Sequence, residues 1–115
     1  MYCKNSDEFT KTNVPKTQKA QIAVLTPKED EDFIVRKIKI EAGGSMPNHT
    51  NKIQHQQYVL EGEAKVVVEN TIYHAKKGDF IYIPAGAAHF YEACYEKDYE
   101  FLCMINTKED AITML

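Results

Sequence analysis

Short stretches in which apolar and polar residues alternate fill most of the chain, and this is the pattern of half-buried β-strands. These stretches are rich in β-branched and aromatic residues, and Gly, Pro, Asn and Asp separate them at short intervals. The pattern predicts eight strands, at 21–26, 33–41, 53–60, 64–69, 71–75, 79–83, 89–94 and 99–106. Eight short strands with almost no helix predict an all-β, antiparallel sandwich or barrel.

Turn-forming residues lie between the predicted strands and make the chain a succession of hairpins. Gly43, Gly44 and Pro47 predict a loop after the second strand. Further turns are predicted at 61–63, 76–79 and 84–89.

The apolar periodicity divides the chain into three parts. Residues 1–20 are polar and form an N-terminal arm, and 21–106 form the barrel. The segment 107–114 has a helical pattern, with Thr107 as N-cap and acidic residues in its first turn. We therefore expect a short helical tail at 107–115.

Composition narrows the class of protein. A chain of 115 residues is one domain and can bury a core without disulfides. The three cysteines are odd in number and have no C-x-x-C spacing, which is typical of reduced thiols in the cytoplasm. No run of eighteen apolar residues and no secretory signal is present, so no membrane contact is expected. The net charge of −3, with charges of both signs interspersed, makes nucleic acid an unlikely partner.

Polar side chains gather on one face of the chain between positions 49 and 59. Alternate residues of a strand share a face. That face carries His49, Asn51, Ile53, His55, Gln57 and Val59. The apolar members place it inside the barrel, where imidazoles and amides need partners. A metal ion is the partner that converging imidazoles suit best, although a structural role is commoner for any single histidine.

The sequence around these histidines resembles the first motif of the small single-domain cupins, the cupin 2 conserved-barrel family. That motif reads G-x5-H-x-H-x3-E-x6-G. Gly43, His49 and Gly62 match it. Asn51 stands where the motif has its second histidine, and His55 stands where it has glutamate, as in some small cupins.

A second segment resembles the second cupin motif, G-x5-P-x-G-x2-H-x3-N. Gly78, Pro84, Gly86 and His89 match it, and Ala93 takes the final Asn position. The resemblance implies the cupin double-stranded β-helix, or jelly-roll barrel, over about 21–106.

Carried over by position, the resemblance implies that His49, His55 and His89 are metal ligands in a three-histidine variant. Asn51 replaces the usual further histidine, and it supplies an amide oxygen, holds a bound water or lines the pocket. His74 lies outside both motifs and is expected to be structural or exposed. Cys94 and Cys103 also occupy no motif position.

Three neutral imidazoles would leave a divalent ion with its full charge and with open positions. Such ligands suit Fe, Mn, Ni, Cu or Zn and do not choose among them. The site resembles the three-histidine centres of cupin-type dioxygenases, so a metal-dependent dioxygenase acting on a small molecule is the leading interpretation. An isomerase or lyase acting on a sugar-derived keto acid and a non-catalytic ligand- or metal-binding cupin are the alternatives. The sequence assigns no catalytic residue.

Two further polar residues have interior parity. Arg36, the only arginine, shares its face with Ile34, Ile38 and Ile40. A buried guanidinium requires an anion, so Arg36 either binds the carboxylate of a substrate or forms an ion pair. Gln57 either contacts substrate or hydrogen-bonds its neighbours.

Small cupins commonly pair through their sheets, and this resemblance implies a homodimer. The N-terminal arm with the first predicted strand would cover an exposed sheet edge of the partner.

Overall fold

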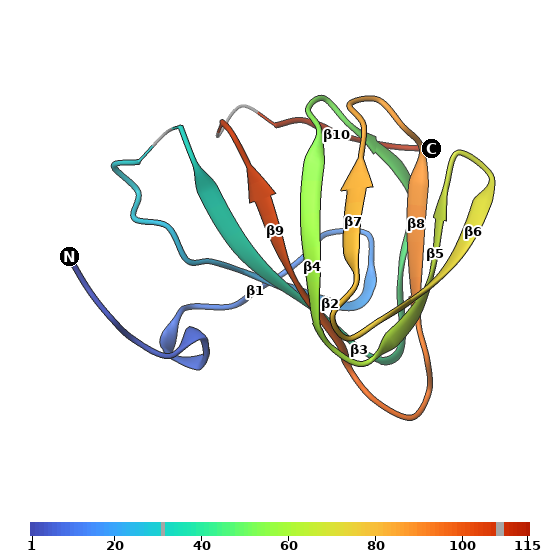
Figure 1. Cartoon of the computed structure of the whole chain (residues 1–115), viewed down its shortest axis with the longest axis horizontal. Coiled ribbons are helices and arrows are strands. Elements are labelled where there is room, and N and C mark those ends of the chain that lie inside the picture. The colour runs from blue at the N-terminus through green and yellow to red at the C-terminus, as the bar shows by residue number, and fades with distance from the viewer. Residues whose placement is uncertain (31, 108–109) are drawn as a thin grey trace.

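The computed structural model describes residues 1–30, 32–107 and 110–115, and the regular secondary structure within these ranges is almost entirely β-strand. In chain order the elements are the short 3-10 helix η1 (Ser6–Glu8) and the strands β1 (Thr12–Asn13), β2 (Gln18–Val24), β3 (Ile34–Asn51), β4 (His55–Glu61), β5 (Glu63–Val68), β6 (Thr71–Lys76), β7 (Phe80–Ile83), β8 (His89–Ala93), β9 (Tyr99–Ile105) and β10 (Ile112–Met114). All eight predicted strands are present, which confirms the all-β class. Figure 1 shows the curled sheet that they form.

The strands follow one another in the sheet in the order β6-β5-β8-β3-β9-β4-β7, and β2 and β10 pair with β3 beside this path. Neighbouring strands in this order are antiparallel. The sheet curls into the jelly-roll arrangement that the two motifs imply. Its concave side encloses the core, and the ends of β3, β4 and β8 meet at one end of it.

β3 runs through the region where a loop was predicted, so the prediction of a loop at Gly43, Gly44 and Pro47 is wrong. Its first half pairs with β9 and its second half with β8, and the register shifts between Met46 and His49. Gly43 has φ +75, a conformation that glycine adopts without strain. A Cβ on Gly44 would lie 2.5 Å from the backbone oxygen of Gln18. The glycines therefore bend β3 and let β2 approach it, and they do not end the strand.

The C-terminal segment differs from the predicted helical tail. Residues 108 and 109 lie outside the described residues, but Ile112–Met114 form β10, which pairs antiparallel with His49–Asn51 of β3. Leu115 extends this edge by donating its backbone N–H to the carbonyl of Asn48. A helix of two turns is marginal in isolation, whereas a sheet edge supplies ready backbone partners. The prediction of a helix is therefore wrong for this segment.

Large side chains on the concave side of the sheet fill the core. Tyr91 stacks on Phe101 with ring centroids 5.4 Å apart, and the tilted ring of Tyr99 lies at the same distance from Phe101. All three are almost completely buried. Tyr91 and Phe101 line the cavity at the polar end of the barrel, where Tyr91 also packs edge-on against His89.

Candidate functional site

Buried polar side chains surround a small cavity at one end of the barrel. Its volume is about 40 Å³. Among its lining residues are His49, Asn51, His55, Gln57 and His89. Each of these five is at least nine-tenths buried, so the prediction that this face of the chain points inward is confirmed. Buried polar groups require partners, and the partners of these residues determine what the cavity can bind.

His49 and His89 lie opposite each other on β3 and β8, with ring centroids 4.1 Å apart. Nδ1 of His49 lies 2.7 Å from the carbonyl oxygen of Pro47, and Nδ1 of His89 lies 2.9 Å from that of Ala87. A carbonyl only accepts, so Nδ1 carries the proton in both rings and Nε2 keeps its lone pair. Burial lowers the pKa of both histidines, that of His89 to about 4, so both rings are neutral at pH 7.

His55 uses both ring nitrogens within the protein. Nε2 lies 2.8 Å from Oδ2 of Asp110, and Nδ1 lies 3.3 Å from Sγ of Cys103. Because the carboxylate accepts, Nε2 carries the proton and Nδ1 accepts from the thiol. Burial lowers the pKa of His55, but its hydrogen bonds to Asp110 and Cys103 outweigh burial and raise it. To bind a metal, His55 would have to give up one of these bonds, so its role as a ligand stays a prediction.

Asp110 connects the segment before β10 to the cavity, although no motif or periodic pattern in the sequence marks it as a site residue. Besides His55, it accepts hydrogen bonds from Nδ2 of Asn51 at 3.0 Å and from the backbone N–H of Ile53 at 3.3 Å. Burial raises the pKa of Asp110, but the hydrogen bond and charge of His55, the backbone N–H of Ile53 and the charge of Arg36 together lower it below its usual value. Oδ1 of Asn51 is buried with no hydrogen-bond partner among the described residues.

Arg36 lies where its parity predicts, partly buried at the wall of the cavity. Its Nη2 donates to Sγ of Cys103 at 3.1 Å, and within the described residues its Nε has no partner. No carboxylate among those residues forms an ion pair with it. Burial raises the pKa of Cys103, but the hydrogen bond to His55 and the charge of Arg36 together lower it below its usual value.

Gln57 is also where it was predicted, on the interior face close to His55. Its Nε2 donates to the hydroxyl of Tyr91 at 2.7 Å and lies 4.0 Å from Sγ of Cys103. Its Oε1 is buried without a partner in the described part of the chain. Gln57 therefore presents one unpaired acceptor to the cavity.

The atoms at the cavity partly fit a metal ion. Among the described residues, no three His, Cys, Asp or Glu side chains stand ready-made as a ligand group. Two neutral imidazoles, those of His49 and His89, nevertheless leave Nε2 free, and Oδ1 of Asn51 is unpaired. Nitrogen and amide oxygen donors of this kind suit divalent transition metals. The hydrogen bonds from Nδ1 to backbone carbonyls orient the rings, as is usual for ligating histidines.

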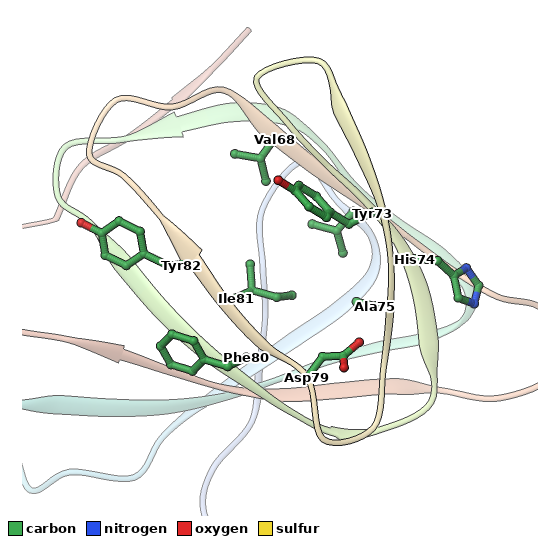
Figure 2. A pocket seen from close by; sticks show the side chains of 9 residues that line it. Val68, Tyr73, His74, Ala75, Asp79, Phe80, Ile81 and Tyr82 are labelled. Carbon is green, nitrogen blue, oxygen red and sulfur yellow. The ribbon is translucent and has the colours of Figure 1, made fainter.

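A larger hollow, of about 320 Å³, lies between β6 and β7 (Figure 2). Ile81, Val68 and Tyr73 face its middle, whereas His74 points away. His74 is exposed and bonds Glu63 at 2.7 Å, so the expectation that it is structural or exposed is confirmed. None of the described residues that line this hollow carries a buried polar side-chain atom without a hydrogen-bond partner. The smaller histidine cavity is therefore the better candidate for chemistry.

Comparisons with known proteins agree with this fold. The profile of the Cupin domain family matches residues 36–105. A cupin-2 domain protein from Rhodospirillum rubrum superposes with a TM-score of 0.86 at 17% identity, over 99% of this chain and 80% of that one. Among proteins of curated function, no match was found. In the described part of the chain no helix is long and apolar enough to cross a membrane.

Two structurally similar proteins have named activities. The polyketide cyclase RemF from Streptomyces resistomycificus has a TM-score of 0.85 at 20% identity, over 100% of this chain and 87% of the cyclase. The oxalate decarboxylase from Lactobacillus farciminis has a TM-score of 0.79 at 18% identity, over 95% of this chain and 34% of the decarboxylase. At these identities the likeness shows a shared fold.

Proposed function

The chain belongs to the Cupin domain family, and from this premise and the geometry of the cavity we propose that it binds a divalent transition metal and acts as an enzyme on a small molecule. His49 and His89 would hold the ion, with Oδ1 of Asn51 as a third donor. His55 would join them by releasing Asp110 or Cys103. The metal is one of Fe, Mn, Ni, Cu or Zn.

One observation carries this proposal. His89 is completely buried, and its Nε2 has no hydrogen-bond partner among the described residues. An unpaired buried nitrogen costs about 1–3 kcal/mol, so it calls for a partner. The centroid of the His49 ring lies 4.1 Å from that of His89, and its Nε2 forms no hydrogen bond with any described residue. A cation bound by both nitrogens would supply the missing partner of His89.

A dioxygenase is the first reaction class to test. A bound transition metal would supply a Lewis acid for a carbonyl or enolate oxygen and a redox partner for O₂. The cavity of about 40 Å³ has room only for groups of about the size of water or O₂. A larger substrate would have to displace partly exposed side chains at the mouth, among them Ile22 and Ile112.

An isomerase or lyase is the second candidate, and the hydrogen bond between His55 and Asp110 favours it. A carboxylate that orients an imidazole is an arrangement for moving protons. Proton transfer is what such reactions need and what O₂ chemistry does not require. Two structural neighbours are named as a polyketide cyclase and an oxalate decarboxylase, which agrees with this alternative.

The guanidinium of Arg36 supports a substrate that carries a carboxylate. It is partly buried, lines the cavity, has an unpaired Nε and forms no ion pair with any described residue. We expect Arg36→Met to abolish binding of small carboxylic acids in calorimetric titration while the circular dichroism spectrum is unchanged. Acid binding equal to that of the parent would remove Arg36 from the site.

The metal content of the purified protein tests whether these histidines form a metal centre. Untagged protein purified without chelator should contain close to one equivalent of a transition metal by plasma mass spectrometry. His89→Ala should lose it, and His74→Ala, a matched change at an exposed histidine, should keep it. His55→Ala then separates the two roles of that residue, because metal is lost only if His55 is a ligand. Equal loss from the His89 and His74 variants would rule out this ligand set.

Oxygen consumption separates the candidate reactions. Uptake of O₂ with a small acid or phenol indicates a dioxygenase, whereas turnover under nitrogen indicates an isomerase or lyase. A parent protein that is empty and cannot be reloaded would instead support a non-catalytic, ligand-binding cupin.

A further inference from the structure

The C-terminal residues 110–115, which we call the strap, lie at the end of the barrel that holds the histidine cavity (Figure 1). Within the strap, β10 pairs with β3 at the three positions from His49 to Asn51. The side chain of Ile112 is 50% exposed and also lines the cavity. Ile112 therefore stands between the cavity and the solvent.

The strap is held less firmly than the other strand at the mouth of the cavity. None of its six residues is buried as a whole. The other strand, β2, supplies Ile22 to the mouth, pairs with β3 from Gln18 to Val24 and buries Ala20 and Ala23. Short, exposed segments at a sheet edge open at a lower free energy than strands that contribute to the core. The strap is therefore the part of the mouth that opens more easily.

One side chain fastens the strap to the interior. The carboxylate of Asp110 is 8% exposed and accepts hydrogen bonds from His55, Asn51 and the backbone N–H of Ile53. His55 and Asn51 both line the cavity. When the strap opens, these hydrogen bonds break and Ile112 leaves the mouth. Entry to the cavity and the release of His55 and Asn51 from Asp110 are therefore one event.

We propose that the strap is a gate that opens to admit molecules larger than water to the histidine cavity, and that Asp110 is the latch that holds it closed. The closed cavity, of about 40 Å³, has room for little more than water. In the closed state Nε2 of His55 and Nδ2 of Asn51 are bonded to Asp110, and in the open state both are available to an entering molecule. The proposal goes beyond the function proposed above and does not depend on a bound metal.

A disulfide between the strap and β3 tests whether the strap opens. Thr113 lies directly opposite Thr50. The Cα atoms of opposite residues in antiparallel strands are about 4.5–5.5 Å apart, a distance that a disulfide spans. Thr50→Cys/Thr113→Cys is oxidised to the cross-linked form, and Thr50→Ser/Thr113→Ser is the matched control that cannot be cross-linked. Both proteins carry Cys3→Ser, which removes the exposed native thiol.

Acylation of histidine by diethyl pyrocarbonate measures access to the cavity, because this reagent is much larger than the closed cavity. Both proteins are freed of metal with a chelator and exposed to the reagent at pH 7, and peptide mass spectrometry gives the acylation rate at each histidine. We expect the cross-link to slow acylation of His49 and His89 by at least about tenfold. The exposed His74 should react equally in both proteins. Equal rates at His49 and His89 with and without the cross-link would overturn the proposal.

Global unfolding is measured separately, because a cross-link also stabilises the folded protein. Urea unfolding of the control protein gives the fraction of unfolded molecules in water. This fraction multiplied by the acylation rate at His74 is the rate expected at His89 if the reagent reaches it only in unfolded molecules. We expect His89 of the control protein to react faster than this product. A rate equal to the product would mean that the strap does not open in the folded protein, and would overturn the proposal.

Asp110→Ala tests the latch. This substitution removes the three hydrogen bonds that the carboxylate accepts, so acylation of His49 and His89 should become about tenfold faster than in the parent. Asp32→Ala, at an exposed carboxylate, should leave both rates at the parental value. Adding the cross-link to Asp110→Ala should slow both rates again. Parental rates in the Asp110→Ala protein would show that Asp110 does not hold the strap closed.

Discussion

Acid should destabilise the metal-free protein through His89. This ring is completely buried, and burial lowers its pKa from 6.5 to about 4. At pH values between about 4 and 6.5, His89 is therefore protonated in the unfolded chain and neutral in the folded chain. The free energy of unfolding decreases as the pH falls through this window. The loss levels off as the pH falls below the folded pKa of about 4.

The magnitude follows from the two pKa values. For a group that titrates at 6.5 when unfolded and about 4 when folded, the loss is about 2 kcal/mol at pH 5 and about 3 kcal/mol at pH 4, relative to pH 7. His49 acts in the same direction, because burial also lowers its pKa. His55 acts in the opposite direction: its pKa is raised, so its stabilisation is present below 6.5 and is lost as the pH rises.

A comparison between variants isolates His89 from these other groups. His89→Asn removes the titrating ring and leaves an amide that can still donate to the carbonyl of Ala87. Urea unfolding of chelator-treated protein at pH 7 and pH 5 gives the pH-dependent loss for each protein. We expect the parent to lose about 2 kcal/mol more than His89→Asn. His74→Asn, at an exposed histidine, should lose as much as the parent.

An equal loss of stability between pH 7 and pH 5 in the His89→Asn protein and in the parent would refute this prediction. That result would mean that the buried ring accepts a proton without cost. The pKa of His89 would then lie near its ordinary value, and its unpaired Nε2 would already have a partner in the folded protein.

Two further predictions concern stability and are measured by urea unfolding at pH 7. Phe101→Ala removes a completely buried ring and should lower the free energy of unfolding by about 3–5 kcal/mol. Phe33→Ala, at a side chain that is 60% exposed, should change it by less than about 0.5 kcal/mol. Equal losses would contradict the described core. Gly62→Ala would place a Cβ 2.0 Å from the backbone oxygen of Asp98. Gly86 has a similar positive φ but no atom within 4 Å of such a Cβ, so Gly86→Ala should lower the free energy of unfolding by only ~1 kcal/mol and Gly62→Ala by several times as much. Similar losses would show that the close contact at Gly62 does not affect stability.

Much of the site was predictable because the sequence pattern that indicates it lies within single strands and motifs. Alternation along a strand assigns residues to a face, and it correctly placed His49, His55 and Gln57 inside. The position of His89 came instead from the resemblance of its segment to a cupin motif, since no periodicity joins β3 to β8. The structure confirms that His49 and His89 face each other.

The partners of His55 were not predictable in this way. Asp110 is 55 residues from it in the chain and Cys103 is 48, and both hydrogen bonds arise only because the sheet curls and its edge receives β10. Local helical propensity predicted a helix for the C-terminal tail, but backbone pairing with β3 overrode this propensity. The sequence by itself thus determined eight of the strands, the inward face and the two motifs, but not the second half of β3 or β10. The tertiary structure decided that both ring nitrogens of His55 have partners, because hydrogen bonds between distant residues depend on the curl of the sheet and leave no periodic trace in the sequence.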